Sequence, residues 1–233
     1  AGDAQTELGI YGACFKIAMV MMMFTQAFRY AYEPFVFARH KDKNSVEAYA
    51  DIMKYYIIAS LFILLGMIFF LDILKLIISP AYWSGLRVVP IVLFSYVFQG
   101  IFFNLSLWYK LTDKTIFGTY FSLIGCVITL AINVLCVPSM SYMASAWASF
   151  VCYLTIMVLS YVVGQRYLRV PYDLRAIGGY FALSCVLLGI YALLVHYWCD
   201  VLWACYLCRV VLIVIYALVV YWREWPKLRR TRL

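Results

Sequence analysis

Seven apolar segments, each long enough to cross a membrane as a helix, dominate this sequence. A helix needs about 20 residues to span the hydrocarbon core of a bilayer. The segments cover residues 8–36, 54–78, 87–110, 115–137, 141–164, 174–196 and 201–222. Polar or proline-containing stretches such as RHKDKN, LTDKT and VPSM separate them. Because continuous apolar runs favour helices over a transmembrane barrel, whose strands alternate in polarity, we predict an all-α, polytopic transmembrane bundle.

Composition excludes a soluble domain of this size. Hydrophobic residues make up 67% of the chain and charged residues only 13%, whereas soluble domains average about half apolar and about a quarter charged. Aromatic residues reach 19%, which suits the aromatic belts found at both membrane interfaces. We therefore expect one transmembrane domain over residues 1–222, followed by a basic tail at 223–233.

Basic residues concentrate on alternate connections between the predicted spans. Fourteen of the 19 lysines and arginines occupy or border segments 38–53, 111–114, 165–173 and the tail. They are Arg39, Lys41, Lys43, Lys54, Lys110, Lys114, Arg166, Arg169, Arg175, Arg223, Lys227, Arg229, Arg230 and Arg232. By the positive-inside rule these segments, including the C-terminus, are cytoplasmic. The same placement explains the net charge of +8 by membrane topology and contacts with anionic lipids, so we expect no nucleic-acid partner.

Motifs for catalysis or cofactor binding are missing from the sequence. It contains no H-E-x-x-H, no G-x-S-x-G and no Walker loop, the patterns that mark zinc peptidases, serine hydrolases and nucleotide-binding proteins. We predict a transporter rather than an enzyme, with no catalytic residue, no cofactor and no metal site.

Ionisable residues interrupt the first predicted span, where burial in lipid is costly. At 100° per residue, the polar side chains of this helix fall within an arc of about 140°. They are Tyr11, Lys16, Gln26, Arg29, Tyr30 and Glu33. A polar stripe along a membrane helix predicts the wall of a hydrophilic cavity. Arg29 and Glu33, four residues apart, can also form an ion pair.

Snorkelling to the membrane surface is an alternative explanation for part of this stripe. Arg29 and Glu33 lie near the predicted cytoplasmic end of the span, where long side chains reach the interface. Lys16 lies about 12 Å of helix from the other end, a depth that snorkelling explains less well. Lys16 is therefore the strongest cavity candidate.

Four polar residues in later spans are further candidates for lining a cavity. Gln99 and Asn104 lie in the third predicted span, Asn133 in the fourth and Arg209 in the seventh. Interhelical hydrogen bonds, typically worth under about 2 kcal/mol, are the alternative for the amides. Arg209 has no acidic residue in its own span, so we expect it to meet a lipid phosphate or a part of the protein outside this chain.

Three sequence blocks, in this order, resemble a known family. The first block is GIYGACFKIAMVMMMFTQAFRYAYEPF, in which Gly9, Tyr11 and Lys16 form a G-x-Y-x-x-x-x-K pattern and Pro34-Phe35 closes the segment. The second is DILKLIISPAYWSGLRVVPIVLFSYVFQG, and the third is LIGCVITLAINVLCVPSMSYMASAWASFVCYL. Over residues 8–165 they resemble bacterial polysaccharide flippases, the Wzx-like exporters of O-antigen and capsule precursors. One departure is that Ser141 and Ala144 stand where the family commonly has glycines.

The resemblance implies membership of the multidrug/oligosaccharidyl-lipid/polysaccharide exporter superfamily, whose members place about 12–14 spans in two lobes around a central cavity. We would then expect this chain to be the C-terminal half of such a protein, with the missing N-terminal half as its partner. The implied substrate is an oligosaccharide on polyprenyl pyrophosphate, moved across the bacterial inner membrane by alternating access. Lys16 and Arg29 match the charge of that pyrophosphate. Membrane lipids, a polysaccharide polymerase and glycosyltransferases are further implied partners.

Several alternatives stay open. A peptidoglycan-precursor flippase would handle the same lipid chemistry. A cation-coupled drug exporter of the same superfamily should carry buried carboxylates, and Glu33 is the only glutamate within a predicted span. Outside transport, the chain could be a structural subunit of a membrane complex or a membrane-embedded glycosyltransferase. The latter needs an acidic or histidine catalytic group beside a large loop, which the sequence does not show.

Overall fold

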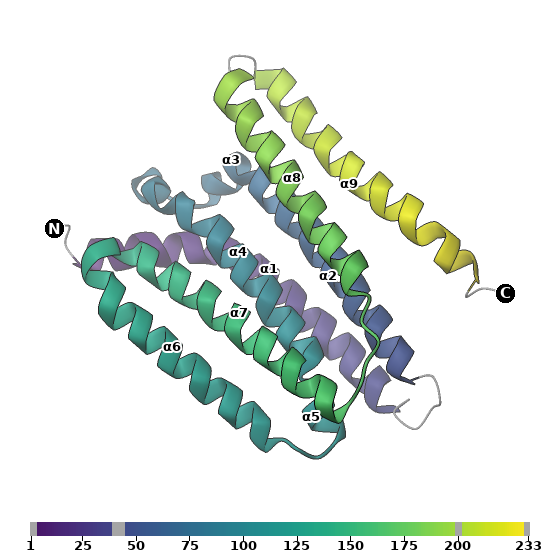
Figure 1. Cartoon of the computed structure of the whole chain (residues 1–233). Helices are drawn as coiled ribbons and strands as arrows, with labels where there is room; N and C mark the ends of the chain where they lie inside the picture. The colour runs from purple at the N-terminus through teal and green to yellow at the C-terminus, as the bar shows by residue number, and fades with distance from the viewer. Residues whose placement is uncertain (1–3, 39–44, 199–201, 231–233) are drawn as a thin grey trace.

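The computed structural model describes residues 4–38, 45–198 and 202–230 of the 233-residue chain. All regular secondary structure in these ranges is helical (Figure 1). The elements are α1 (Ala4–Ala38), α2 (Ser45–Phe69), α3 (Leu71–Leu74), η1 (Lys75–Ile77), η2 (Pro80–Arg87), α4 (Val88–Leu105), α5 (Leu107–Leu111), α6 (Ile116–Met140), α7 (Tyr142–Tyr167), α8 (Leu174–Trp198) and α9 (Leu202–Arg230).

Seven helical stretches among the described residues are long and apolar enough to cross a membrane. They are Gln5–Ala38, Ser45–Phe69, Pro80–Leu111, Ile116–Met140, Tyr142–Tyr167, Leu174–Val195 and Tyr206–Trp225. The third combines η2, α4 and α5. The prediction of an all-α polytopic bundle with about seven spans is confirmed.

The long helices run back and forth, roughly along one common direction (Figure 1). Helix α4 is central, because it packs against α1, α2 and α7. Helix α6 packs on α7 at one edge of the bundle, and the α8–α9 hairpin packs on α2 at the other. Helix α1 is therefore held directly against α4, whereas α9 packs mainly on α2 and α8.

Burial follows this arrangement. The apolar windows of the second and third spans are 61% and 67% buried, whereas that of α6 is only 11% buried. The outer side of α6 presents Leu123, Val127, Leu130 and Val134. Lipid covers such a surface without cost, since hydrocarbon tails are as apolar as these side chains.

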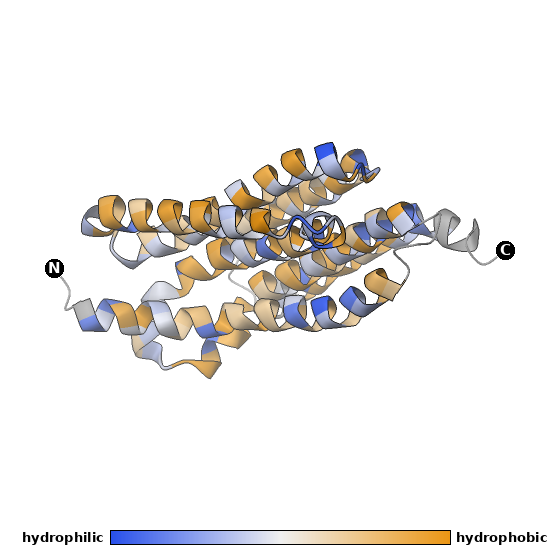
Figure 2. Cartoon of the chain, turned by 90° about the horizontal axis from the view of Figure 1, so that it is seen from below, coloured by the Kyte–Doolittle hydropathy of each residue, from blue (hydrophilic) through white to orange (hydrophobic). Residues whose placement is uncertain are grey.

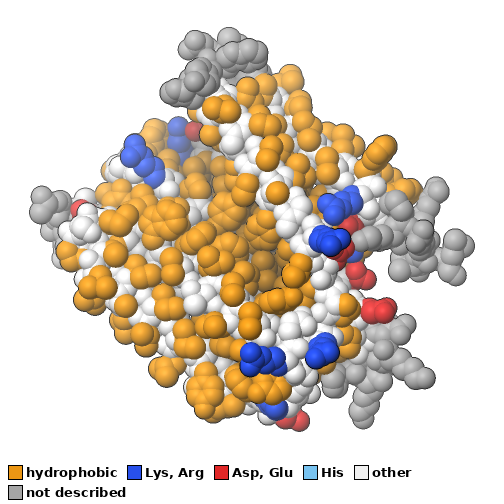
Figure 3. Space-filling view, viewed as in Figure 1, with side chains coloured by type: hydrophobic (Ala, Val, Ile, Leu, Met, Phe, Trp, Pro, Cys, Tyr) orange, Lys and Arg blue, Asp and Glu red, His pale blue; other side chains and the backbone are white. Residues whose placement is uncertain are grey.

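Charged side chains lie mostly toward the ends of the bundle, as a membrane-spanning body requires. In the space-filling view, hydrophobic side chains cover the middle of the face, and lysines and arginines lie near its rims (Figure 3). Colouring the ribbon by hydropathy shows hydrophobic residues along most of the length of the helices (Figure 2). The connections predicted to be cytoplasmic follow or precede helix ends that share one end of the bundle. Arg39, Lys41, Lys43 and Arg232 of those connections lie outside the described residues.

Several helix ends differ from the sequence-based expectation. The span predicted at 54–78 is helix α2 over Ser45–Phe69, and the predicted break at 79–85 is helical, because η2 covers Pro80–Arg87. The predicted turn at 137–140 is helical, because α6 continues through Pro138 to Met140, and the chain reverses at Ser141, whose φ is 52°. A proline close to a helix end removes only one intrahelical hydrogen bond and has a φ that suits the helix. Helix α9 continues past residue 222 to Arg230, so the predicted basic tail is helical over most of its length.

Candidate functional site

Helix α1 has a buried side and an outward side. Cys14, Met21 and Val36 are fully buried against the bundle, and at 100° per residue they lie roughly opposite Lys16. Lys16 is exposed, and Tyr30, on the same side, is 69% exposed. Among the described residues, none forms a hydrogen bond or ion pair with Lys16. The span thus presents an unpaired ammonium group on its outward face.

Arg29 and Gln26 lie at the edge of that face, beside α4. The guanidinium carbon of Arg29 is 4.9 Å from the ring centroid of Phe103 and 5.5 Å from that of Tyr30, which is the range of a cation–π contact. Arg29 Nε and Gln26 Oε1 are both buried and have no hydrogen-bond partner within the described part of the chain. Because unpaired buried polar atoms are costly, both atoms are candidates for contacts with a ligand or with water.

Glu33 forms an ion pair with a different residue from the one predicted. Its Oε1 lies 2.5 Å from Lys110 Nζ on α5, and no ion pair joins Glu33 to Arg29 in the described structure. The predicted Arg29–Glu33 pair is therefore wrong. The reason is tertiary, because α5 places an ammonium group beside Glu33 while Arg29 packs on aromatic rings. The polar stripe consequently separates into a paired carboxylate and two cations, Lys16 and Arg29, that have no ion-pair partner among these residues.

The three amide candidates make contacts between or within helices. Gln99 Nε2 donates to the Tyr153 hydroxyl at 2.8 Å, which joins α4 to α7. Asn133 Oδ1 accepts a 2.8 Å hydrogen bond from Ser145 Oγ, which joins α6 to α7. Asn104 is buried and donates to the carbonyl of Gly100 in its own helix at 2.9 Å. The Gln99 and Asn133 contacts are the interhelical hydrogen bonds considered as the alternative, and cavity lining by these residues stays a prediction.

Arg209 is buried and ion-paired inside this chain. Its Nη2 lies 2.5 Å from Asp72 Oδ2 on α3, and its guanidinium also faces the rings of Tyr191 and Tyr206. The expectation that Arg209 meets a lipid phosphate or a part of the protein outside this chain is corrected accordingly. Asp72 precedes Arg209 by 137 residues, so only the packing of the α8–α9 hairpin brings the two together.

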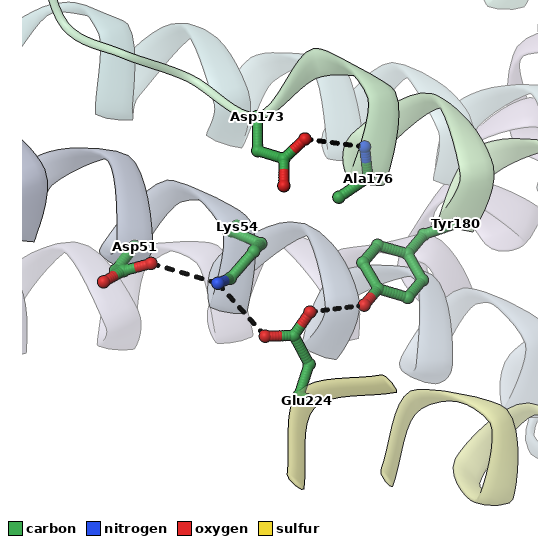
Figure 4. A network of polar contacts seen from close by, with 6 residues as sticks. All are labelled: Asp51, Lys54, Asp173, Ala176, Tyr180 and Glu224. Carbon is green, nitrogen blue, oxygen red and sulfur yellow. Dashed lines mark hydrogen bonds and ion pairs between the residues drawn. The ribbon is translucent and has the colours of Figure 1, made fainter. Parts of the chain in front are cut away.

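A buried polar network that the sequence analysis missed joins α2, α8 and α9 (Figure 4). Lys54 Nζ lies 3.1 Å from Glu224 Oε2 and 3.0 Å from Asp51 Oδ1. The Tyr180 hydroxyl donates to Glu224 Oε1 at 2.6 Å. Glu224 lies in the predicted basic tail. One feature of the sequence marks this residue, because it is the only acidic residue after Asp200 and lies in a strongly basic segment. Glu224 lies close to the end of the span Tyr206–Trp225, and its side chain is buried.

Potential metal ligands do not gather in the described structure. Over residues 4–38, 45–198 and 202–230, no group of three or more histidine, cysteine, aspartate and glutamate side chains could hold a metal ion. The distinctive polar features of α1 are instead cationic and aromatic side chains inside a membrane span.

A family model described as MatE matches residues 4–135, from α1 into α6, which is more than half of the chain. The chain belongs to the MatE family. This MatE protein is a multi-pass membrane exporter of the multidrug/oligosaccharidyl-lipid/polysaccharide superfamily, and hence a transporter. No curated protein and no solved structure matches the chain.

Proposed function

We propose that this MatE protein exports an oligosaccharide linked to polyprenyl pyrophosphate, a precursor of O-antigen, capsule or exopolysaccharide. The bundle would form one lobe, and it would alternate access with a second lobe to a cavity between them. The observation that carries this proposal is Lys16, a cation on the outward face of a membrane-spanning helix that has no ion-pair partner in the described part of the chain.

Electrostatics connect Lys16 to this substrate class. A charged side chain inside a membrane span is expensive unless it faces a wet cavity or an opposite charge. Pyrophosphate supplies concentrated negative charge and strong hydrogen-bond acceptors, which pair well with ammonium and guanidinium groups. Lys16 and Arg29 lie on the same helix and have no ion-pair partner among the described residues. Both are therefore available to a substrate phosphate.

The placement of basic residues supports an orientation. The cytoplasmic side would be the end of the bundle that carries the basic connections, including the end of α9. In a bacterial inner membrane the lipid-linked glycan would then enter from that end. The glycosyltransferases that build the glycan and the polymerase that extends it would be the expected partners on the two sides.

Cation-coupled drug export is less well supported by the carboxylates of this chain. Glu33 and Glu224 are each ion-paired with a lysine, at 2.5 Å and 3.1 Å. A carboxylate held by a lysine is a poor site for a second cation, because the lysine repels it. A peptidoglycan-precursor flippase shares the pyrophosphate chemistry, so a transport assay with two glycans must distinguish the two flippases.

The test uses the full-length protein in liposomes that contain a fluorescent lipid-linked oligosaccharide. We expect Lys16→Ala and Arg29→Ala each to slow translocation by about tenfold or more, equivalent to about 1.4 kcal/mol. Lys16→Arg should retain most activity, because it keeps the charge. Lys114→Ala is the matched control, since Lys114 is exposed at a helix connection and packs on Tyr167. Normal translocation by both alanine variants would overturn the proposal, and transport of peptidoglycan precursor alone would reassign the substrate.

A further inference from the structure

A groove of about 390 Å³ lies between α1 and the segment that joins α2 to α4. We call residues 71–87, comprising α3, η1 and η2, the connecting segment. The groove is lined on the α1 side by Ala13, Lys16, Ile17 and Val20, and on the other side by Leu74, Ile77, Ile78, Ser79 and Tyr82. Its lining is therefore mainly apolar, with one cationic group, Lys16.

The connecting segment is fixed against α1, so the groove exists before anything binds. Gly85 lies so close to α1 that a Cβ at this position would collide with Ile10 and come within 2.9 Å of Cys14 Sγ. The Cys14 thiol faces the carbonyl of Tyr82 at 3.5 Å. Within the segment, Trp83 Nε1 donates to the carbonyl of Lys75 at 3.2 Å. A preformed groove binds a ligand without the entropy cost of ordering its walls.

We propose that this groove binds the phosphate-proximal part of a polyprenyl chain while Lys16 contacts the lipid phosphate. This inference rests on the proposed function, because the polyprenyl lipid is the carrier of the exported glycan. The groove combines an apolar wall, which favours burial of hydrocarbon, with an ammonium group that no described residue pairs with, which favours an anion. Inorganic phosphate would leave the apolar wall unused, and a neutral lipid would leave Lys16 unpaired. An anionic lipid with a long apolar chain satisfies both.

The position of the groove also suggests when it is occupied. The connecting segment lies at the end of the bundle opposite the basic connections (Figure 1). Under the proposed orientation this is the outer half of the membrane. The groove would therefore hold the carrier after the glycan has crossed and before the lipid leaves.

The test measures binding of a long-chain polyprenyl monophosphate to the full-length protein in nanodiscs of neutral lipid. Ala13→Phe fills the groove, and Ala31→Phe is its matched control, because Ala31 lies on the same side of α1 about five turns away and is exposed. Ile77→Ser is a second groove variant. Ile77 is 76% exposed, so we expect this substitution to have little effect on the stability of the fold. Leu76→Ser is the control for it, since Leu76 is 72% exposed and does not line the groove.

We expect Ala13→Phe, Ile77→Ser and Lys16→Ala each to weaken binding by about fivefold or more, as loss of roughly 1 kcal/mol of apolar or ionic contact predicts. Both control variants should bind as the wild type does. If Ala13→Phe and Ile77→Ser both bind the polyprenyl phosphate as tightly as the wild type does, the inference is overturned. Displacement of the probe by phosphatidylglycerol or inorganic phosphate at equal concentration would also overturn it, because the site would then select any anionic lipid or any phosphate.

The outcome also separates this inference from the proposed function. If Lys16→Ala and Arg29→Ala stop translocation while both groove variants bind and transport normally, the proposed function stands and the groove does not. If the groove variants no longer bind polyprenyl phosphate while Lys16→Ala and Arg29→Ala translocate the glycan normally, the groove is supported as a lipid site and the proposed role of the two cations in transport is rejected.

Discussion

Lys54 on α2 and Glu224 on α9 form an ion pair, with 3.1 Å between the charged atoms and side chains that are 5% and 3% exposed. The Tyr180 hydroxyl on α8 donates to the same carboxylate. One carboxylate thus links the α8–α9 hairpin to α2. Arg209 and Asp72 join α9 to α3, nearer the other end of α9. The hairpin is consequently held by ion pairs at two levels, about 22 Å apart along α9 at 1.5 Å per residue.

Breaking the Lys54–Glu224 pair on one side should destabilise the protein strongly. We expect Lys54→Met to lower the free energy of unfolding by about 3–5 kcal/mol, because it leaves a buried carboxylate without its counter-charge. The double variant Lys54→Met/Glu224→Met should recover most of the loss, since it removes both charges. Unfolding in mixed micelles of detergent and SDS measures both. Lys75→Met, which removes a lysine from a partly exposed pair with Asp72, is the control. A double variant no more stable than Lys54→Met would contradict this reading.

The Glu33–Lys110 pair should contribute less, although its charged atoms are closer. The two side chains are 24% and 31% exposed, so water screens the pair and solvates either charge when the other is removed. We expect Glu33→Gln to lower the free energy of unfolding by about 1 kcal/mol or less. The same micelle titration, run beside Glu224→Gln, provides the comparison. A Glu33→Gln loss as large as that of Glu224→Gln would show that the exposure of the pair does not set its strength.

Gly100 on α4 should not tolerate a side chain. A Cβ at this position would overlap the hydroxyl of Tyr56, which is fully buried on α2 and forms a 2.9 Å hydrogen bond with Thr25 on α1. We expect Gly100→Ala to lower the free energy of unfolding by about 1–3 kcal/mol, the usual range for overpacking. Adding Tyr56→Phe should recover part of that loss. The thermal midpoints of the two single variants and the double variant test this, and simple additivity would exclude a direct clash.

Replacing Ser141 by glycine should stabilise the folded protein. Its φ of 52° and ψ of −141° lie in a region that side chains disfavour by about 1–3 kcal/mol. Its hydroxyl donates to the Glu7 carboxylate on α1, which offsets part of that strain. We expect Ser141→Gly to raise the thermal midpoint and Ser141→Ala to lower it, because alanine keeps the strain and loses the hydrogen bond. A Ser141→Gly protein that melts below the wild type would show that the Glu7 contact outweighs the strain.

The departure from the family pattern at Ser141 thus has a structural counterpart. The resembled family commonly has a glycine at this position, and the structure shows a backbone at Ser141 that only glycine adopts without strain. Residue 144, the other departure, is a fully buried alanine in α7. A small side chain there still permits close helix packing.

Hydrophobic patterning by itself determined the class of this protein. The presence of about seven spans follows from the sequence, because a lipid bilayer requires long apolar helices. The polar stripe on the first helix follows too, because helical geometry determines which residues share a side. Helical geometry also places Lys16 on the side of α1 opposite Cys14 and Met21. These are local properties, and each depends only on residues within one helix.

Tertiary structure alone decided which charges pair between helices. Glu33 forms an ion pair with Lys110 rather than with Arg29. Arg209 pairs with Asp72, and Glu224 pairs with Lys54. Each partner lies in another helix, so its identity depends on which helices become neighbours and how each is rotated. Inside a membrane the cost of an unpaired charge makes such partners decisive. The groove beside Lys16 likewise exists only because the connecting segment folds back onto α1.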